Sequence, residues 1–467
     1  MLIDQKNTVT LPVYNSYTGE TIGTVPQATS EDVMQALDLA KKGEAIGKNM
    51  PAAARVAILK KAVILMEQDF DVLSNLIATE GVKTISQARK EVERALNTMQ
   101  LSAEEAARIS GATIPFNAVA GSEDRVGYEL KCPIGIVVAI TPFNDPLNLV
   151  CHKLGPAIAA GNPVILKPSD YTPLIALKFG EILYEAGLPK EMLSIITGAP
   201  EHFGDALISD ERVRLISFTG GVAAAEAIQR KAGLKKIVME LGSNSPVIVL
   251  SDADVADAVV SCVSGAFFAS GQNCVGVKRI FIDAGIFDSF VAQFTSQTAA
   301  LKIGSPLTED VDIGPIVSQQ AIAQIDSYVE ESIKNGAKLI AGGKAVGASY
   351  VPTILVAECS NDIANCKEVF GPVVTLSKVE NLEQAITYCN KSPFGLHAAI
   401  FTNDINNAHK AIKGLECGGV IVNDSTDYRI DAMPFGGVKL SGIGREGVKS
   451  TIEAMSETKV VCFKLKL

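Results

Sequence analysis

The chain has 467 residues, 47% of them hydrophobic and 20% charged, with a formal net charge of -10. This length exceeds what one hydrophobic core usually supports, so two or three domains are expected. The excess of acidic residues argues against nucleic-acid binding, which needs a dense basic face. The sequence has no apolar run of about 18 residues without charges, so no membrane span is expected.

The termini and the cysteines indicate a cytoplasmic protein. The opening sequence MLIDQKNTVTLPVYN has no basic segment followed by an apolar one, so no secretion signal is expected. Nine cysteines are scattered without a CxxC pair, which is typical of reduced thiols. None of the four histidines has a second ligand candidate at metal spacing, so no metal site is expected.

Residues 31–110 are rich in Ala, Leu, Glu and Lys, with apolar residues recurring at three and four, which predicts several amphipathic helices. From residue 135 short β-branched runs alternate with helical stretches. This alternation predicts a parallel, doubly wound sheet. The expected strands lie at 135–140, 162–168, 193–198, 214–220 and 235–241, and the expected helices at 147–161 and 172–189.

A second alternating series runs from about 252 to 440 and predicts a second α/β domain. The tail ETKVVCFKLKL (457–467) alternates like an exposed strand. Such a strand needs a partner edge, which an oligomer would supply.

Two strand-to-helix turns of the first series are candidates for cofactor binding. Thr219, Gly220 and Gly221 lie where backbone N–H groups could approach a phosphate, although GxGxxG is missing and an ordinary turn is the alternative. Lys167 ends an apolar strand and Asp170 follows it, so the pair could hold ribose hydroxyls. An exposed loop with routine charges would look the same.

Three further side chains could carry chemistry, and each has a structural alternative. Asn144, stiffened by Pro142 and Pro146, could stabilise an oxyanion or close a turn. Glu240 after an apolar strand could be a general base or a helix cap. Cys274, with small neighbours, could be a nucleophile or a buried inert thiol.

Taken together, the order and spacing of these segments resemble the aldehyde dehydrogenase superfamily over nearly the whole chain. The resemblance implies an α/β fold with a Rossmann-type parallel-sheet cofactor domain (1–116 and 136–241), an α/β catalytic domain (242–450) and a small β oligomerisation flap (117–135 and 451–467). The matching segments are TPFN (141–144), LGPAIAAGNPVILKPS (154–169), FTGG (218–221), MELGSNSP (239–246), GQNC (271–274), EVFGPV (368–373), GLHAAIFTND (395–404) and MPFGGVKLSGIGREG (433–447).

By this resemblance Cys274 is the nucleophile that forms a thiohemiacetal and then a thioester. Asn144 and the backbone N–H of Cys274 would hold the oxyanion, and Glu240 would activate water for hydrolysis. Lys153 and Glu446 match a pair that passes protons away from the base, although a structural ion pair is an equal alternative.

The resemblance also assigns cofactor residues. Lys167 and Glu368 would hold the riboses, and Phe370 would lie beside the nicotinamide. Asp170 stands where NAD-preferring relatives often carry Glu, so NAD is expected over NADP. Ala225 departs from the family, which usually keeps glycine there. The remaining cofactor-binding candidates are Thr219, Gly220, Gly221 and Gly242.

The positions that line the substrate tunnel of the family are polar in this chain. One of them is Arg429, and its guanidinium there would pair with a carboxylate, phosphonate or sulfonate group of the substrate, often bidentately. The alternative is that Arg429 pairs with Asp427 or Asp431. Asn273 departs from the phosphonoacetaldehyde branch, in which some members carry Arg before the cysteine. The candidate substrate residues are Asp145, His152, Asn273 and Arg429.

The sequence therefore predicts NAD-dependent oxidation of a short, polar, anionic aldehyde to the carboxylic acid by a homodimer or homotetramer. A CoA-acylating semialdehyde dehydrogenase is one alternative, although Glu240 argues against it. An oxidoreductase for neutral hydroxyaldehydes such as lactaldehyde is another. A catalytically idle relative and a cysteine hydrolase complete the alternatives.

Overall fold

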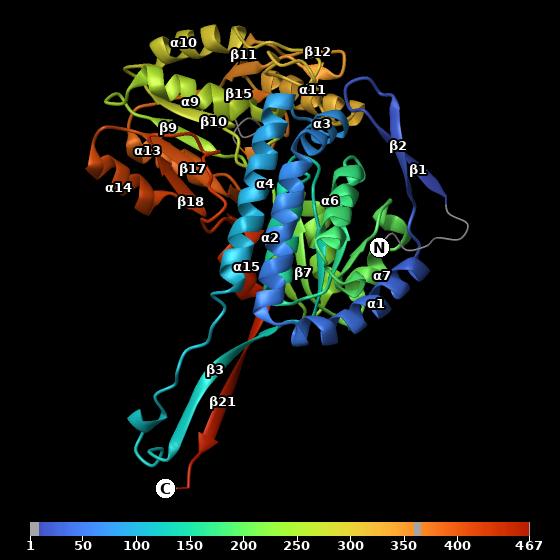
Figure 1. Cartoon of the computed structure of the whole chain (residues 1–467). Helices are drawn as coiled ribbons and strands as arrows, with labels where there is room; N and C mark the ends of the chain where they lie inside the picture. Colours follow the sequence, from blue (N-terminus) through green and yellow to red (C-terminus); the bar gives the residue numbers. More distant parts are fainter. Residues whose placement is uncertain (1–8, 359–365, 467) are drawn as a thin grey trace.

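The structure, a computed structural model, describes residues 9–358 and 366–466. Two α/β lobes are stacked, and a long two-stranded arm projects from the lower one (Figure 1). The segments 1–8 and 359–365 and residue 467, which belong to the expected cofactor domain, catalytic domain and flap respectively, lie outside the described residues. No helix in the described part of the chain combines the length and the hydropathy that crossing a membrane requires.

The first lobe is built on a six-stranded sheet. Its order is β20-β8-β7-β4-β5-β6, and all neighbours are parallel except β20 and β8. Because helices cover both faces, β4 and β5 are almost wholly buried and read as continuous apolar runs. The strands are β4 (Ile136–Ile140), β5 (Val164–Lys167), β6 (Leu193–Ile195), β7 (Val213–Thr219), β8 (Lys236–Glu240) and β20 (Gly442–Ile443).

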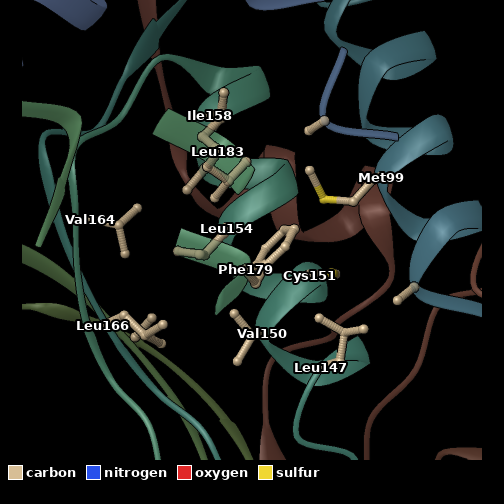
Figure 2. Close-up of a cluster of buried hydrophobic side chains, with 14 of the residues drawn as sticks. Met99, Leu147, Val150, Cys151, Leu154, Ile158, Val164, Leu166, Phe179 and Leu183 are labelled. Carbon is tan, nitrogen blue, oxygen red and sulfur yellow. The ribbon is translucent and has the colours of Figure 1, made fainter. Parts of the chain in front are cut away.

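Helix α5 (Asn148–Ala160) is buried along its whole length, and its apolar side chains form the centre of the largest core (Figure 2). It packs against α4 (Ile85–Ala106) on one side and lies against the sheet on the other. The remaining elements of this lobe are β1 (Thr10–Tyr14), β2 (Thr21–Pro26), α1 (Ser30–Asn49), α2 (Ala52–Gln68), α3 (Phe70–Glu80), α6 (Pro173–Glu185), α7 (Gly204–Ser209) and α8 (Val222–Ala232).

The second lobe carries a seven-stranded sheet in the order β11-β14-β15-β10-β9-β17-β18. Only β11 runs antiparallel to its neighbour. Its strands are β9 (Pro246–Val249), β10 (Arg279–Asp283), β11 (Lys338–Ala341), β14 (Thr353–Val356), β15 (Val373–Val379), β17 (His397–Phe401) and β18 (Gly419–Val422). The helices are α9 (Val255–Phe267), α10 (Phe287–Ala299), α11 (Gln319–Lys334), α13 (Leu382–Asn390) and α14 (Ile405–Gly414). Short strands are β12 (Ala345–Val346), β13 (Ser349–Tyr350), β16 (Phe394–Gly395) and β19 (Val438–Lys439).

The α/β class and the two parallel sheets confirm the expected fold. Strands β3 (Arg125–Pro133) and β21 (Ser456–Lys464) pair antiparallel along their full lengths and form the arm. One observation departs from the expected boundary at residue 450: β20 adds to the first sheet, and α15 (Val448–Ala454) packs on α5 and α4. The chain therefore returns to the first lobe before it enters the arm.

Candidate active site

The loop that carries Cys274 has an unusual backbone. Helix α9 ends at Phe267. Shortly after it, Ala269, Ser270 and Gly271 have φ values of 51°, 56° and 69°. Left-handed conformations are unfavourable for residues with a Cβ, so the surroundings must hold them. Gln272 does so, because its amide nitrogen donates to Pro315 O (3.0 Å) and its amide oxygen accepts from Val317 N (3.0 Å).

This loop opens onto a cavity of about 220 Å³ between the two lobes. The cavity collects side chains from both sheets and from the loop before β20. Of the residues singled out in the sequence, those lining it are Asn144, Asp145, Thr219, Glu240, Asn273, Cys274, Arg429 and Glu446.

Cys274 is half-buried, and its environment acts on the thiol in two directions. Burial raises the pKa of Cys274 to about 12, while the nearby Arg429 opposes that rise. Neither the backbone N–H of Cys274 nor the side-chain amide of Asn144 donates a hydrogen bond to a described residue. Two donors that face one cavity without partners can bind an oxygen atom that develops negative charge.

Glu240 ends β8 and is only 3% exposed. Both of its carboxylate oxygens are buried without a hydrogen-bond partner in the described structure. Burial, then the neighbouring Glu446, raise the pKa of Glu240. A carboxylate held in this way is a stronger base than one in water.

Lys153 and Glu446 lie next to Glu240 as a buried ion pair. Lys153 Nζ is 2.6 Å from Glu446 Oε1 and 3.0 Å from Ser217 Oγ. Burial alone would raise the pKa of Glu446, but Lys153, His152 and Arg429 outweigh it and hold this pKa below its ordinary value. The structure thus brings the expected pair together, in a geometry that either a proton path or a structural bridge would have.

A second cavity of about 430 Å³ lies on the other side of Gln272, which lines both. Glu368 and Phe370 line this second cavity, and the Phe370 ring packs edge-on against Phe143, with centroids 5.8 Å apart. A Cβ at Gly242 would lie 2.3 Å from Glu368 Oε2, so only glycine leaves the carboxylate in this place.

The carboxyl edge of the first sheet fits a dinucleotide. Helix α8 begins after Thr219 and Gly220, with Gly221 at its cap position and no capping side chain, so its first N–H groups are open to a phosphate. Lys167 Nζ bonds Asp170 Oδ1 (2.5 Å) at the neighbouring strand end. Ala225 is 3% exposed and sits in a small apolar cluster, so the helix start accommodates its methyl group.

Sequence reasoning missed a group of cations on the wall of the catalytic cavity. Lys83, which is 2% exposed, contacts Glu91 (2.7 Å) and Asp145, and Arg94 on α4 contacts Asp145 (3.4 Å). Their signal was weak, because Arg94 and Lys90 lie in a helix where charges at this spacing usually face solvent. Only the packing of α4 on α5 turns that face toward Cys274.

His152 does not line either cavity, which corrects its expected place in the substrate tunnel. It is fully buried, and its Nε2 lies 2.9 Å from Asp431 Oδ1. Asp431 Oδ1 also accepts from Arg94 (2.9 Å) and from the amide of Asn148 (3.2 Å). Burial, then the adjacent Arg429, lower the pKa of His152. Its role in the structure is to hold Asp431.

Arg429 lines the catalytic cavity with its guanidinium over the Phe435 ring, 3.7 Å from the centroid. It forms no ion pair with a described carboxylate, so neither expected partner, Asp427 nor Asp431, takes it. Its Nε is buried without a hydrogen-bond partner among the described residues. Its closest polar contact is His152 Nε2 at 3.4 Å, a nitrogen that needs its hydrogen for Asp431.

Among the described residues, no three His, Cys, Asp or Glu side chains are grouped to hold a metal ion. Within the described part of the chain, the site consists of a thiol, an unpartnered carboxylate, two open donors and a cation without a contact ion pair, and it lies beside a strand edge at which a helix begins with open N–H groups.

Known proteins match this chain along its length. A sequence model described as the aldehyde dehydrogenase family covers residues 3–461. A 3-sulfolactaldehyde dehydrogenase of Priestia megaterium is 42% identical, with 97% of this chain and 95% of that protein covered. A lactaldehyde dehydrogenase of Methanocaldococcus jannaschii is 41% identical, with 99% of each covered.

Among solved structures, the glyceraldehyde-3-phosphate dehydrogenase of Methanocaldococcus jannaschii complexed with NADP superimposes with a TM-score of 0.94 and 39% identity, covering 99% of this chain and 100% of that chain. Both the match of the family model and the identity of these relatives extend over both lobes and the arm. The chain belongs to the aldehyde dehydrogenase family.

Proposed function

We propose that this aldehyde dehydrogenase oxidises a short aldehyde carrying an anionic group to the carboxylic acid, with NAD as the hydride acceptor. The observation that carries the substrate class is Arg429, a buried guanidinium that lines the cavity of Cys274 without a carboxylate partner in the described structure. Burial lowers the pKa of Arg429, and Glu446 and Asp431 oppose this only through space, without a contact ion pair, so an anionic ligand in contact with the guanidinium would reduce the cost of burying it.

The reaction begins at the Cys274 sulfur. The thiol gives up its proton to a base, with Glu240 the nearest unpartnered carboxylate, and the thiolate attacks the aldehyde carbon. The carbonyl oxygen becomes an oxyanion, and the backbone N–H of Cys274 and the Asn144 amide bind it. The product of this step is a thiohemiacetal on Cys274.

A bound nicotinamide dinucleotide would accept hydride from this carbon. Lys167, Asp170 and Glu368 would hold its riboses, and the open first turn of α8 would hold its phosphates. Loss of hydride leaves a thioester on Cys274. After Glu240 has passed the thiol proton on toward solvent, it takes a proton from water, and the hydroxide attacks the thioester carbon. The acid then leaves, the Cys274 sulfur departs as a thiolate, and the proton held by Glu240 restores the thiol.

Glu240 must pass the proton of the thiol to solvent before it can activate water in the same turnover. Glu446 and Lys153 lie beside it in the interior, and Thr219 Oγ1 is 3.5 Å from Glu446 Oε1. These groups form a buried polar route away from the base, which supports the proton-passing role.

NAD is proposed over NADP because of Asp170. A carboxylate at this strand end accepts a hydrogen bond from a ribose 2′-hydroxyl and repels a 2′-phosphate. Since the Asp170 side chain is shorter than Glu and is 43% exposed, we expect a preference rather than strict exclusion.

The sequence relatives alone do not choose between an anionic and a neutral substrate. The 3-sulfolactaldehyde and lactaldehyde dehydrogenases are about equally similar to this chain, and their named substrates differ by one sulfonate group. The unpaired Arg429 favours the anion. A neutral hydroxyaldehyde remains the second candidate because it would fit the same cavity.

A cytoplasmic homodimer or homotetramer fits the remaining features. No disulfide joins the described cysteines, and the arm exposes apolar side chains that a second copy could cover. The exposed side chains of the arm include Val126, Tyr128, Leu130, Val460 and Phe463.

The test is NADH formation by the purified protein with 3-sulfolactaldehyde, succinic semialdehyde, lactaldehyde and butanal, each with and without CoA. We expect the highest kcat/KM for the two anions and a free acid as product in every case. Equal kcat/KM for lactaldehyde and 3-sulfolactaldehyde would refute the anionic assignment. Detection of an acyl-CoA product would refute hydrolysis, because it would show that the acyl group passes from Cys274 to CoA and not to water.

A further inference from the structure

Lys278 precedes β10 directly, is 3% exposed and takes no part in the steps above. A buried ammonium needs acceptors, because removing a charge from water without hydrogen bonds to replace the lost hydration is strongly unfavourable. Its Nζ donates to Gly271 O (2.5 Å) and Gly371 O (3.2 Å). No described carboxylate forms a contact ion pair with Lys278, so the hydrogen bonds of its ammonium go to these two main-chain oxygens.

The two carbonyls belong to the two segments between which the hydride must move. Gly271 is the last of the three left-handed residues and lies three positions before Cys274. Gly371 follows Phe370 directly and lies three positions after Glu368. One segment places the nucleophile and the other faces the cofactor cavity.

The backbones of these segments touch at the point where Lys278 binds them. A Cβ at Gly271 would lie 2.1 Å from Gly371 O, so only hydrogen separates the chains there. The ammonium therefore bridges a contact in which no side chain could intervene.

The charge of Lys278 also acts on the reacting groups. Burial lowers the pKa of Lys278 to about 8, and the carboxylate of Glu368, then the thiol of Cys274, act in the opposite direction. Reciprocally, Lys278 counteracts the burial that raises the pKa of Glu368. One cation is thus within electrostatic reach of both the ribose carboxylate and the nucleophile.

We propose that Lys278 is a positioning residue that fixes the Glu368–Phe370 segment relative to Cys274, and so sets the line along which hydride leaves the thiohemiacetal. This inference rests on the proposed function, since it needs Cys274 as nucleophile and Glu368 as a cofactor ligand. Without the ammonium, two buried carbonyls would lose their shared donor and the two loops could shift independently.

The experiment compares Lys278→Met and Lys278→Arg with a matched control. Lys439 provides the control, because its Nζ likewise donates to two carbonyls, Asn390 O (2.8 Å) and Ser392 O (3.3 Å), and it lines neither cavity. Each variant is assayed for kcat, KM for NAD and KM for the aldehyde, with rates divided by the amount of folded protein.

For Lys278→Met we expect kcat to fall at least about tenfold and KM for NAD to rise at least about fivefold, because small misplacements of reacting groups are costly. KM for the aldehyde should change less than about twofold, since Arg429 and the oxyanion donors stay in place. Lys278→Arg keeps a charged donor and should recover part of the loss, while Lys439→Met should match the parent enzyme.

Unchanged kcat and KM for NAD per folded Lys278→Met enzyme, with only a lower Tm, would overturn the positioning role. If Lys278→Met does not fold, Lys278→Arg decides: parental values in both parameters, despite its altered geometry, would equally overturn the proposal. Cys274→Ala separates the two hypotheses. Turnover by Cys274→Ala refutes the proposed function itself, whereas an inactive Cys274→Ala beside a fully active Lys278→Met refutes positioning alone.

Discussion

Replacing Arg429 with Leu tests the substrate assignment most directly. Leucine keeps an apolar contact with the Phe435 ring, on which the guanidinium lies at 3.7 Å, and removes the charge and the fork of donors. Arg429 forms no contact ion pair with a described carboxylate, but its charge lowers the pKa of Glu446 and opposes the rise in the pKa of Cys274, and the substitution removes this effect. That electrostatic effect applies equally to charged and uncharged aldehydes, so the ratio of their kcat/KM values isolates the contribution of Arg429 to substrate binding.

The magnitude follows from the lost interaction. A hydrogen bond to a charged group contributes about 1.5 to 3 kcal/mol, which is roughly a 10- to 150-fold change in an equilibrium. The assay measures kcat/KM for 3-sulfolactaldehyde and for lactaldehyde, which share the reacting end. Their ratio should fall by roughly 10- to 150-fold in Arg429→Leu, mainly through KM for the sulfonate.

Arg429→Lys provides the matched control, because it keeps a point charge and loses the bidentate geometry, so the ratio should lie between the other two. A change below about threefold in Arg429→Leu, or an equal loss for both aldehydes, would refute the reasoning. In that case Arg429 acts on the site as a whole and not on the anion.

Cys274→Ala should bind NAD with parental affinity by calorimetry and lose at least about a thousandfold in turnover, and substantial NADH formation would contradict the nucleophile assignment. Glu240→Gln should retain a first burst of NADH in stopped flow but turn over about 10²- to 10⁴-fold more slowly, with a thioester mass adduct on the protein; a lost burst would place Glu240 before hydride transfer instead. Because burial raises the pKa of Cys274 to about 12, its alkylation by iodoacetamide without cofactor should rise about tenfold per pH unit from pH 7 to 9, read by peptide mass spectrometry, and a plateau in that range would contradict the buried thiol. Asp431→Asn breaks a buried charge network and should cost about 3 kcal/mol in the free energy of unfolding, whereas a loss below about 0.5 kcal/mol would show that the network contributes little.

Local patterns predicted the centre of the first sheet well because β4 and β5 are almost wholly buried and are apolar along nearly their whole length. These strands span residues 136–140 and 164–167, and their order in the sheet follows from the helices between them. The return of residues 442–454 to the first lobe left no such signal, since β20 has two residues and its pairing with β8 depends on contacts far along the chain.

The candidate catalytic side chains could be named from motifs, but their partners in the structure could not. Whether Arg429 forms an ion pair depends on the contacts of the Asp431 carboxylate. In the structure this carboxylate binds Arg94 and His152 and not Arg429. Arg94 lies 337 residues away from Asp431 in sequence, so this competition is visible only in three dimensions. Lys278 likewise looks like an ordinary basic residue beside a strand until the fold places two carbonyls around it.

The way Asp431 is bound has a consequence for how the substrate range of this enzyme can change. The fold anchors Asp431 through direct contacts with Arg94, Asn148 and His152, and Arg429 forms no direct hydrogen bond with Asp431 in the described structure. Recognition and scaffold are therefore separable at this position. Under the proposed role of Arg429, a single replacement at residue 429 would shift the preference of the enzyme from charged toward uncharged aldehydes, and such a switch would be readily accessible to evolution and to design.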